Sequence, residues 1–305
     1  YKRQNVHILS HTLHYGTGVF EGVRAYSTEN GPAIFKLKDH TKRLFDAASK
    51  IGINISFTED ELNKAQCDTL IKNNLKEGYL RPIVFLGNEG LGLRAKDLSV
   101  NVAVAAWEWP SYMDPEAKKN GISVIKSSHT QYENPLHSGN KIIGTYFSNT
   151  MALHEALDKG ADEALMLDKN GYISEGSGEN IFIVKDDVIY TPTTEHCLNG
   201  ITRQSVMQIA EDLKLIEVSE LENTSIDRFN LLSSNNIRLT DFPINEHALG
   251  MLSDEIGNHM EKSGALPTDR KMTIEARNDA IIINSCQGTK INETLGHLLL
   301  AMAST

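Results

Sequence analysis

Two apolar stretches constrain the fold of the N-terminal part more than any other feature of the sequence. Tyr79–Leu86 and Val100–Trp107 have the length and apolar content of strands. Upstream, Thr58 is followed three residues later by a glutamate, the pattern of a capping box, which predicts a helix that runs to about Lys76. Helices and strands in this order predict a compact α/β unit that ends near Pro115.

Further elements are predicted on either side of these strands. Asp39 can cap a helix that runs through Ser49, and Thr202 can cap a later helix whose inner face begins at Val206. The connection Leu13–Gly18 is rich in turn-forming residues. A helix is predicted at Tyr146–Leu157, and strands are predicted at Val6–Leu9, Val19–Tyr26, Ala33–Leu37, Gly121–Lys126, Glu163–Leu167, Ile173, Asn180–Val184 and Val188–Thr191.

Length and composition narrow the classes of function. A chain of 305 residues suggests about two domains. The net charge of −10 argues against broad binding to nucleic acid, and no stretch resembles a membrane span or a signal peptide. The three cysteines, Cys67, Cys197 and Cys286, are scattered and lack the spacing of metal ligands. This pattern predicts a cytoplasmic protein without a metal site.

Lys141 is the strongest candidate for chemistry. It follows a polar loop and precedes the apolar pair Ile142–Ile143, which leads into the predicted helix. A lysine becomes a useful nucleophile when its amine is partly desolvated, as in enzymes that bind pyridoxal 5'-phosphate (PLP) covalently. Tyr146 can reach the phenolic oxygen of such a ring. The alternatives are an exposed lysine and a tyrosine that packs in the core.

A carboxylate is the second group that PLP chemistry needs, because the ring nitrogen must be held protonated. Glu175 and Glu179 are the candidates, and glycines lie between them. Glu175 ends a short predicted strand, whereas Glu179 precedes an apolar one. Their spacing does not choose between them, and a surface turn explains the same pattern.

Anionic groups on a cofactor and a substrate need fixed donors. Gly200–Thr202 opens a predicted helix and can form an anion site, and Arg43 can add a bidentate clamp. Arg81 follows Tyr79–Leu80 and precedes the apolar remainder of that strand, where an arginine is less expected and more often has a task. The alternatives are an ordinary helix start and a solvated arginine. Residues that can line an apolar pocket are Tyr15, Phe20, Arg24, Tyr26, Trp107 and Trp109, although core packing is the simpler explanation of the tryptophans.

Several stretches in the same order resemble the class IV aminotransferases of PLP fold type IV, most closely the branched-chain amino acid aminotransferases. The resemblance covers about residues 3–216. The stretches that carry it are His14–Gly16, Val19–Tyr26, His40–Leu44, Tyr79–Pro82, Lys141–Tyr146, Ile173–Phe182 and Leu198–Arg203.

The resemblance implies an α+β fold with two domains and a homodimer. It divides the chain into a small α/β domain at 1–118 and an incomplete large PLP-binding domain at 119–216. Residues 217–305 are then an unrelated α/β segment that stands in place of the family's C-terminal part. The implied activity transfers the amino group of leucine, isoleucine or valine to 2-oxoglutarate.

The resemblance also implies roles for single residues. Lys141 would be the catalytic lysine that holds PLP, Tyr146 would contact the ring oxygen, and Glu175 rather than Glu179 would contact the ring nitrogen. The implied phosphate ligands are Arg43, Ile201 and Thr202, and the implied substrate-pocket residues are Tyr15, Phe20, Arg24 and Arg81.

The pattern of the family breaks after Lys214. The expected Gly-Thr loop, which would complete the phosphate and carboxylate sites, is not found there, so impaired activity is expected. Residues 228–305 instead resemble a segment of large helicase-related (Lhr-type) proteins, but the chain has no GxxxxGK[ST] loop for ATP. A fusion of two incomplete proteins is one interpretation and a diverged tail is another. The alternative function is an inactive fusion or a binding module whose tail contacts nucleic acid or a protein partner.

Overall fold

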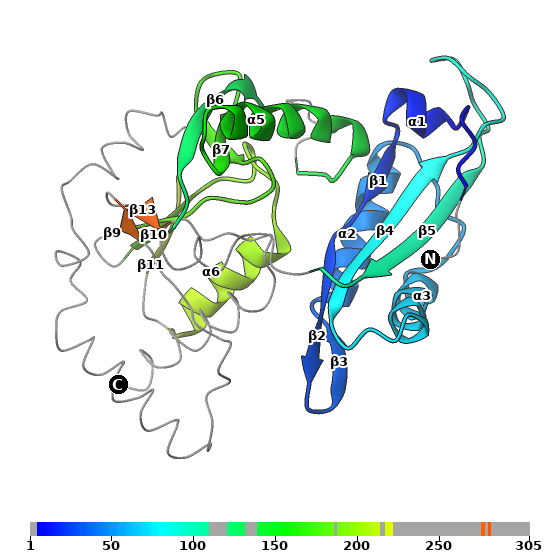
Figure 1. The fold of residues 1–305 in the computed structure, drawn as a ribbon, viewed down its shortest axis with the longest axis horizontal. Coiled ribbons are helices and arrows are strands. Elements are labelled where there is room, and N and C mark those ends of the chain that lie inside the picture. Colours follow the sequence, from blue (N-terminus) through cyan, green and yellow to red (C-terminus); the bar gives the residue numbers. More distant parts are fainter. Residues whose placement is uncertain are drawn as a thin grey trace. The chain divides into compact units, whose positions relative to one another are not determined.

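The computed structural model describes residues 5–109, 121–131, 139–185 and 188–213, together with the short strands at 217–221, 276–277 and 280–281 (Figure 1). The chain forms two compact units. The first contains Tyr1–Pro110 and Tyr132–Asn149, and the second contains Ser111–Gln131 and Thr150–Thr305. The segment around Lys141 therefore belongs to the first unit. The domain borders at residues 118 and 216 implied by the resemblance stay a prediction.

The first unit is built on one antiparallel sheet. Its long central strand β4 (Gly78–Leu86) pairs along its whole length with β5 (Val100–Trp107), which confirms both apolar strands. Along its other edge β4 pairs with two short strands in succession, β1 (Gly18–Phe20) and β2 (Val23–Thr28), and β2 pairs with β3 (Gly31–Ile34). The single strand predicted at Val19–Tyr26 is thus two strands, separated at Glu21 and Gly22.

Two helices pack on one face of this sheet (Figure 1). Helix α3 (Glu59–Lys72) has the predicted capping box between Thr58 and Glu61. Helix α2 (Leu37–Lys50) begins earlier than predicted, so Asp39 lies in its first turn and is not its cap. The buried apolar residues that join these helices to the sheet are Val19, Leu44, Ala47, Ala48, Ile53, Leu62, Val84 and Ile142.

The sequence interpretation is wrong at the start of this unit. Val6–Leu9 is not a strand, and its apolar side chains Val6, Ile8 and Leu9 are exposed. The stretch expected to be turn-rich contains the short helix α1 (His11–Tyr15), which Gly16 ends. Among the described residues, neither segment pairs with a strand that would satisfy an extended backbone, so the apolar pattern alone did not predict the structure there.

The Lys141 segment joins the first unit through both side-chain and backbone contacts. Ile142 is in the buried core and forms an isolated β-bridge with Val19. The Phe20 amide donates to the Lys141 carbonyl over 3.2 Å. A 3-10 turn, η1 (Ile143–Thr145), then leads into helix α5 (Tyr146–Asp158). The backbone on both sides of the Lys141 side chain is therefore anchored.

The second unit contains two small sheets. In one, β6 (Val124–Thr130) is parallel to β7 (Glu163–Leu167), and β7 is antiparallel to β8 (Ile173–Gly176). Helix α5 is the crossover between the two parallel strands, as such a connection requires. The other sheet contains β9 (Ile183–Lys185), β10 (Val188–Pro192) and β11 (Glu217–Leu221), and helix α6 (Ile201–Leu213) lies between β10 and β11 in the chain.

Most of the predicted C-terminal tail lies outside the described residues. The sequence pattern predicts a helix at Leu249–Met260, a strand at Met272–Glu275 and a last helix from about Asn292 to Met302, and all three lie outside the described residues. Two described strands, β12 (Ala276–Arg277) and β13 (Ala280–Ile281), pair antiparallel. In the ranges that the structure describes, no helix combines the length and the apolarity needed to cross a membrane.

Candidate active site

The predicted site residues fall into two groups. The first unit contains Tyr15, Phe20, Arg24, Arg43, Arg81, Lys141 and Tyr146. The second unit contains Glu175, Ile201 and Thr202. Each group has its own network of contacts.

Lys141 and Tyr146 form the centre of the first group. The Lys141 amine donates a hydrogen bond to the Tyr146 hydroxyl over 2.6 Å. The ring of Phe20 packs edge-on against Tyr146, with 4.7 Å between the ring centroids, and Lys141 Nζ lies 5.3 Å from the centroid of Phe20. The turn at Ile143–Thr145 brings the two polar groups together, because it reverses the chain within the five residues that separate them.

Several charges act on the Lys141 amine. Burial lowers its pKa, the Tyr146 oxygen raises it and the Arg43 guanidinium lowers it. The Glu21 carboxylate adds to the upward effect, and the net result is a pKa above the usual value. In this arrangement the amine is protonated at neutral pH, so it becomes a nucleophile only after it has given up a proton.

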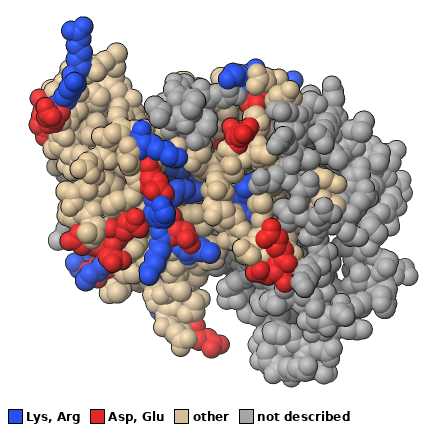
Figure 2. Space-filling model, turned by 180° about the vertical axis from the view of Figure 1, so that it is seen from behind, with Lys and Arg blue, Asp and Glu red and all other residues tan. Residues whose placement is uncertain are grey.

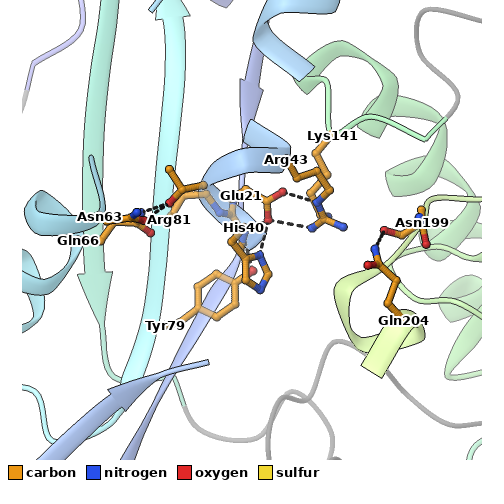
Figure 3. Close-up of polar contacts among 12 residues, drawn as sticks. Glu21, His40, Arg43, Asn63, Gln66, Tyr79, Arg81, Lys141, Asn199 and Gln204 are labelled. Atoms are coloured by element: carbon orange, nitrogen blue, oxygen red, sulfur yellow. Dashed lines mark hydrogen bonds and ion pairs between the residues drawn. The ribbon is translucent and has the colours of Figure 1, made fainter. Parts of the chain in front are cut away.

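Glu21 is a functional candidate that the sequence reading did not select. Its carboxylate is fully buried and contacts two residues of α2 (Figure 3). Arg43 donates from Nε to Oε1 over 2.6 Å and from a terminal nitrogen to Oε2 over 2.9 Å. His40 Nδ1 lies 2.8 Å from Oε2. An acidic residue directly after the apolar pair Val19–Phe20 in a predicted strand was the available signal, since such a charge is buried only when it is paired.

This network keeps Glu21 ionised. Burial raises the pKa of its carboxyl, but Arg43 and His40 lower it more, so the pKa falls from 4.5 to about 2. The bidentate contact also holds Arg43, whose side chain is only 14% exposed. The alternative of a solvated arginine on a helix face is therefore wrong.

Arg81 and Arg24 bring two more guanidinium groups to the first unit. Arg81 lies over the ring of Phe20, with 4.8 Å from its guanidinium carbon to the ring centroid, and it donates to the Tyr79 hydroxyl over 3.3 Å. Within the described part of the chain, the Nε atoms of Arg24 and Arg81 are buried and have no hydrogen-bond partner. Buried donors of this kind fit an anionic ligand. Tyr15 lies at the end of α1, where its ring packs on His11 with 4.5 Å between centroids.

Gly22 permits a close approach by Tyr79. A Cβ atom at position 22 would lie 1.8 Å from the Tyr79 hydroxyl. The ring of Tyr79 is packed against Trp107 and Trp109, with centroids 5.3 Å and 4.6 Å away, so it has little freedom to retreat.

We expect Gly22→Ala to displace Tyr79 and thereby the hydroxyl that accepts from Arg81. Overpacking of this kind costs about 1–3 kcal/mol of stability. Thermal unfolding measures that cost, and the KM for an amino-acid substrate should rise several-fold. In a Tyr79→Ala background the same glycine substitution should cost little, and an equal cost in both backgrounds would contradict the steric explanation.

Glu175 is the centre of the second group. Its carboxylate accepts hydrogen bonds from the side chain of Gln131, from the Asn180 amide over 3.2 Å and from the Leu198 backbone amide over 3.0 Å. Three neutral donors stabilise an anion without neutralising it, which suits a carboxylate that must hold a cation. Glu179 is buried, whereas Glu175 is partly exposed, and the Glu179 carbonyl accepts from the Gly176 amide over 2.7 Å.

Ile201 and Thr202 occupy the first turn of α6. Thr202 is the second residue of this helix and therefore does not cap it. The first amides of a helix lack partners within the helix and favour an anion. Arg203 is buried and donates to the Pro192 carbonyl over 2.9 Å, which fixes the start of α6 to the end of β10.

The chain belongs to the class IV aminotransferases. The family described as "Amino-transferase class IV" matches residues 18–232. Enzymes of this family depend on PLP, and the fold of this chain is that of fold type IV. The chain is thus a PLP-dependent aminotransferase by descent and by fold.

The individual relatives are named for a narrower activity than the family as a whole. A branched-chain-amino-acid aminotransferase of Pseudomonas aeruginosa is 52% identical over 214 residues, which cover 69% of this chain and 70% of the relative. The enzyme of that name from Escherichia coli is 42% identical over 218 residues, with 70% of each chain covered.

Solved structures agree with this assignment. The crystal structure of the Escherichia coli branched-chain amino acid aminotransferase has a TM-score of 0.71 at 40% identity, with 75% of each chain covered. The enzyme of that name from the archaeon Thermoproteus uzoniensis, solved with norvaline, has a TM-score of 0.70 at 36% identity, with 75% of this chain and 76% of the other covered.

Proposed function

We propose that this chain transfers the amino group of leucine, isoleucine or valine to 2-oxoglutarate with PLP as its cofactor. The observation that carries the proposal is the 2.6 Å contact between the Lys141 amine and the Tyr146 hydroxyl, in a chain that is 52% identical to an enzyme named for this reaction. The relatives' names support the donor, and 2-oxoglutarate is the acceptor that the family resemblance implies.

Each of the two groups contains side chains whose chemistry suits PLP. Lys141 would hold it covalently, Tyr146 would contact its ring oxygen, and Glu175 would contact its ring nitrogen. Arg43, Ile201 and Thr202 would hold its phosphate, since an arginine fork and a helix start both favour such an anion. When bound, PLP supplies an electron sink for negative charge on the α-carbon of the substrate.

Proton transfer then depends on the Lys141 amine. In its neutral form, Nζ can take the proton from the α-carbon of the amino acid and pass it to the cofactor within the same half-reaction. In the second half-reaction it would carry a proton in the opposite direction, to the α-carbon of the oxo acid. Tyr146 orients this nitrogen through the 2.6 Å hydrogen bond. Burial and the Tyr146 oxygen have the largest effects on its pKa, and the charges of Arg43 and Glu21 add smaller effects in opposite directions.

The substrate carboxylate would bind to Arg24 and Arg81, whose buried Nε donors have no partner among the described residues. Phe20 and Tyr15 would line the pocket for the apolar side chain. A branched aliphatic group suits such a wall, because its burial removes apolar surface from water.

We propose further that the protein is a cytoplasmic homodimer. The first unit exposes Ile8 by 70%, Leu13 by 60% and Leu93 by 88%. The loop before Leu93 is tied to α1, since His11 Nε2 lies 3.3 Å from the Gly92 carbonyl. Exposed apolar side chains gathered in this way favour a protein partner.

We expect sedimentation to give the mass of a dimer. The double substitution Leu13→Glu with Leu93→Glu should shift the protein toward the monomer, because each introduces a charge that an apolar interface must desolvate. Ile71, which is 65% exposed on the last turn of α3, provides a control substitution to glutamate. A monomeric wild-type protein at micromolar concentration would contradict the proposal.

The catalytic proposal is tested by incubating the purified protein with PLP, leucine and 2-oxoglutarate and measuring glutamate. Glutamate formation from leucine, isoleucine and valine is the expected result, and a preference for a D-amino acid would reject the substrate assignment. The rate of the Pseudomonas aeruginosa relative gives the standard for the predicted impairment. An absorption spectrum without bound PLP would favour the alternative of an inactive fusion.

Binding to nucleic acid is disfavoured on the described surface. On the face drawn in Figure 2, basic and acidic side chains lie side by side over the described residues. Lys42 and Lys64 each form an ion pair four residues along their helices, with Asp46 and Asp68. The resemblance of residues 228–305 to helicase-related proteins stays a prediction. A gel shift at low salt tests whether the protein binds nucleic acid.

A further inference from the structure

One buried amide connects the two halves of the candidate cofactor site in the second unit. Asn180 lies between β8 and β9 and is 4% exposed. Its Nδ2 group donates to Glu175 Oε2 over 3.2 Å and to the Leu198 carbonyl over 2.8 Å. The Leu198 amide donates to the same Glu175 oxygen over 3.0 Å. Asn180, Glu175 and Leu198 are therefore each hydrogen-bonded to the other two.

The oxygen of this amide faces the start of α6. A Cβ atom placed on Gly200 would lie 2.1 Å from Asn180 Oδ1 and 3.3 Å from its Cγ, whereas its next neighbour, Arg203 Cβ, is 3.5 Å away. The Gly200 amide donates to the Leu198 carbonyl over 2.8 Å, and the Gln204 amide donates to the Gly200 carbonyl over 2.9 Å at the first turn of α6. Asn180 thus touches Glu175 on one side and the residue before α6 on the other.

We propose that Asn180 is a positioning residue that sets the Glu175 carboxylate and the amino end of α6 at the spacing that PLP requires. This inference rests on the proposed function, in which Glu175 contacts the ring nitrogen and Ile201–Thr202 hold the phosphate. Ring and phosphate are joined by a short methylene ester link that allows only a narrow range of distances between them, so an error in the spacing of their two binding sites weakens both contacts together.

An asparagine is the side chain that these contacts need. Both acceptors, the Glu175 carboxylate and the Leu198 carbonyl, take a hydrogen from the same NH₂ group. An aspartate of the same shape has no such donor and would place a second negative charge beside Glu175. Leucine would fill the space and leave both acceptors without this donor, at a cost for each buried group.

The first test is the binding of PLP to the apo-protein, measured by absorbance titration. We expect Asn180→Ala to weaken PLP binding about tenfold and to change the absorption maximum of the bound cofactor, because Glu175 loses a donor beside the ring nitrogen. Asn180→Asp, which preserves size, should weaken binding at least as much. Asn170→Ala, at an exposed position in the turn between β7 and β8, is the matched control and should bind PLP as the wild type does.

A double-mutant cycle then tests the contact with α6. Gly200→Ala alone should weaken PLP binding by more than tenfold, because the new methyl group meets the Asn180 oxygen. Adding Asn180→Ala removes that oxygen, so the double variant should bind PLP better than Gly200→Ala alone. Additive losses, or an Asn180→Ala protein with wild-type affinity and spectrum, would overturn the proposal.

Different results would reject the proposed function and the positioning role of Asn180. A wild-type protein that binds no PLP rejects the proposed function. A wild-type protein that binds PLP, together with an unaffected Asn180→Ala variant, rejects the positioning role alone. Unfolding of each apo-variant in urea is measured in parallel. A variant that loses stability but retains the affinity and the spectrum assigns Asn180 a purely structural role and also overturns the proposal.

Discussion

Lys141→Ala is expected to abolish the covalent attachment of PLP and to lower the rate of amino-group transfer by at least about 10²–10⁴-fold, the usual contribution of a positioned proton-transfer group. The reason is that the amine is both the proposed attachment point and the proposed carrier of the α-carbon proton. Borohydride reduction followed by peptide mass mapping measures the attachment independently of activity.

The controls for this prediction separate charge from chemistry. Lys141→Arg preserves a cation beside Tyr146 and Glu21 but cannot be deprotonated, so it should be as inactive as the alanine variant. Lys72→Ala, at the last turn of α3, should retain wild-type labelling and rate. A reduced PLP adduct on any peptide other than that of Lys141 would contradict the assignment.

Glu21→Ala is expected to destabilise the first unit by about 3–5 kcal/mol, because it leaves the buried charge of Arg43 without its partner. Loss of the bidentate contact also frees Arg43, so the affinity for PLP should fall. Glu21→Gln preserves the volume and separates the loss of charge from the loss of packing. Urea unfolding with and without PLP measures both effects.

The free energy of unfolding should depend on pH in the acid range through the same Glu21 carboxylate. The pKa of Glu21 is about 2 in the folded protein and 4.5 without these contacts, so its stabilisation is complete above 4.5 and is lost as the pH falls toward 2. A difference of this size corresponds to roughly 3 kcal/mol. We expect the free energy of unfolding to fall less steeply with acid in Glu21→Gln than in the wild type. Parallel curves for the two proteins would contradict the prediction.

Local sequence patterns were sufficient where the interaction partners are close in the chain. The capping box of Thr58 and Glu61 is present as predicted, and so are the two apolar strands β4 and β5. Lys141 and Tyr146 meet for the same reason, since a single turn separates them. The apolar stretch Val6–Leu9 shows the limit of such patterns, because its composition carries no information about a pairing strand.

By itself, the sequence determined the class of enzyme and predicted the catalytic lysine and the two candidate glutamates, since these rest on ordered short motifs. Only the tertiary structure decided how their charges are held. Glu21 is far from Arg43 and His40 in the chain. Burial raises the pKa of its carboxyl, and only the contacts with these two residues bring the pKa down to about 2. Asn180 contacts Glu175 and Gly200 only because β8 and the start of α6 come together. Contacts between segments distant in the chain depend on packing, which residue spacing does not record.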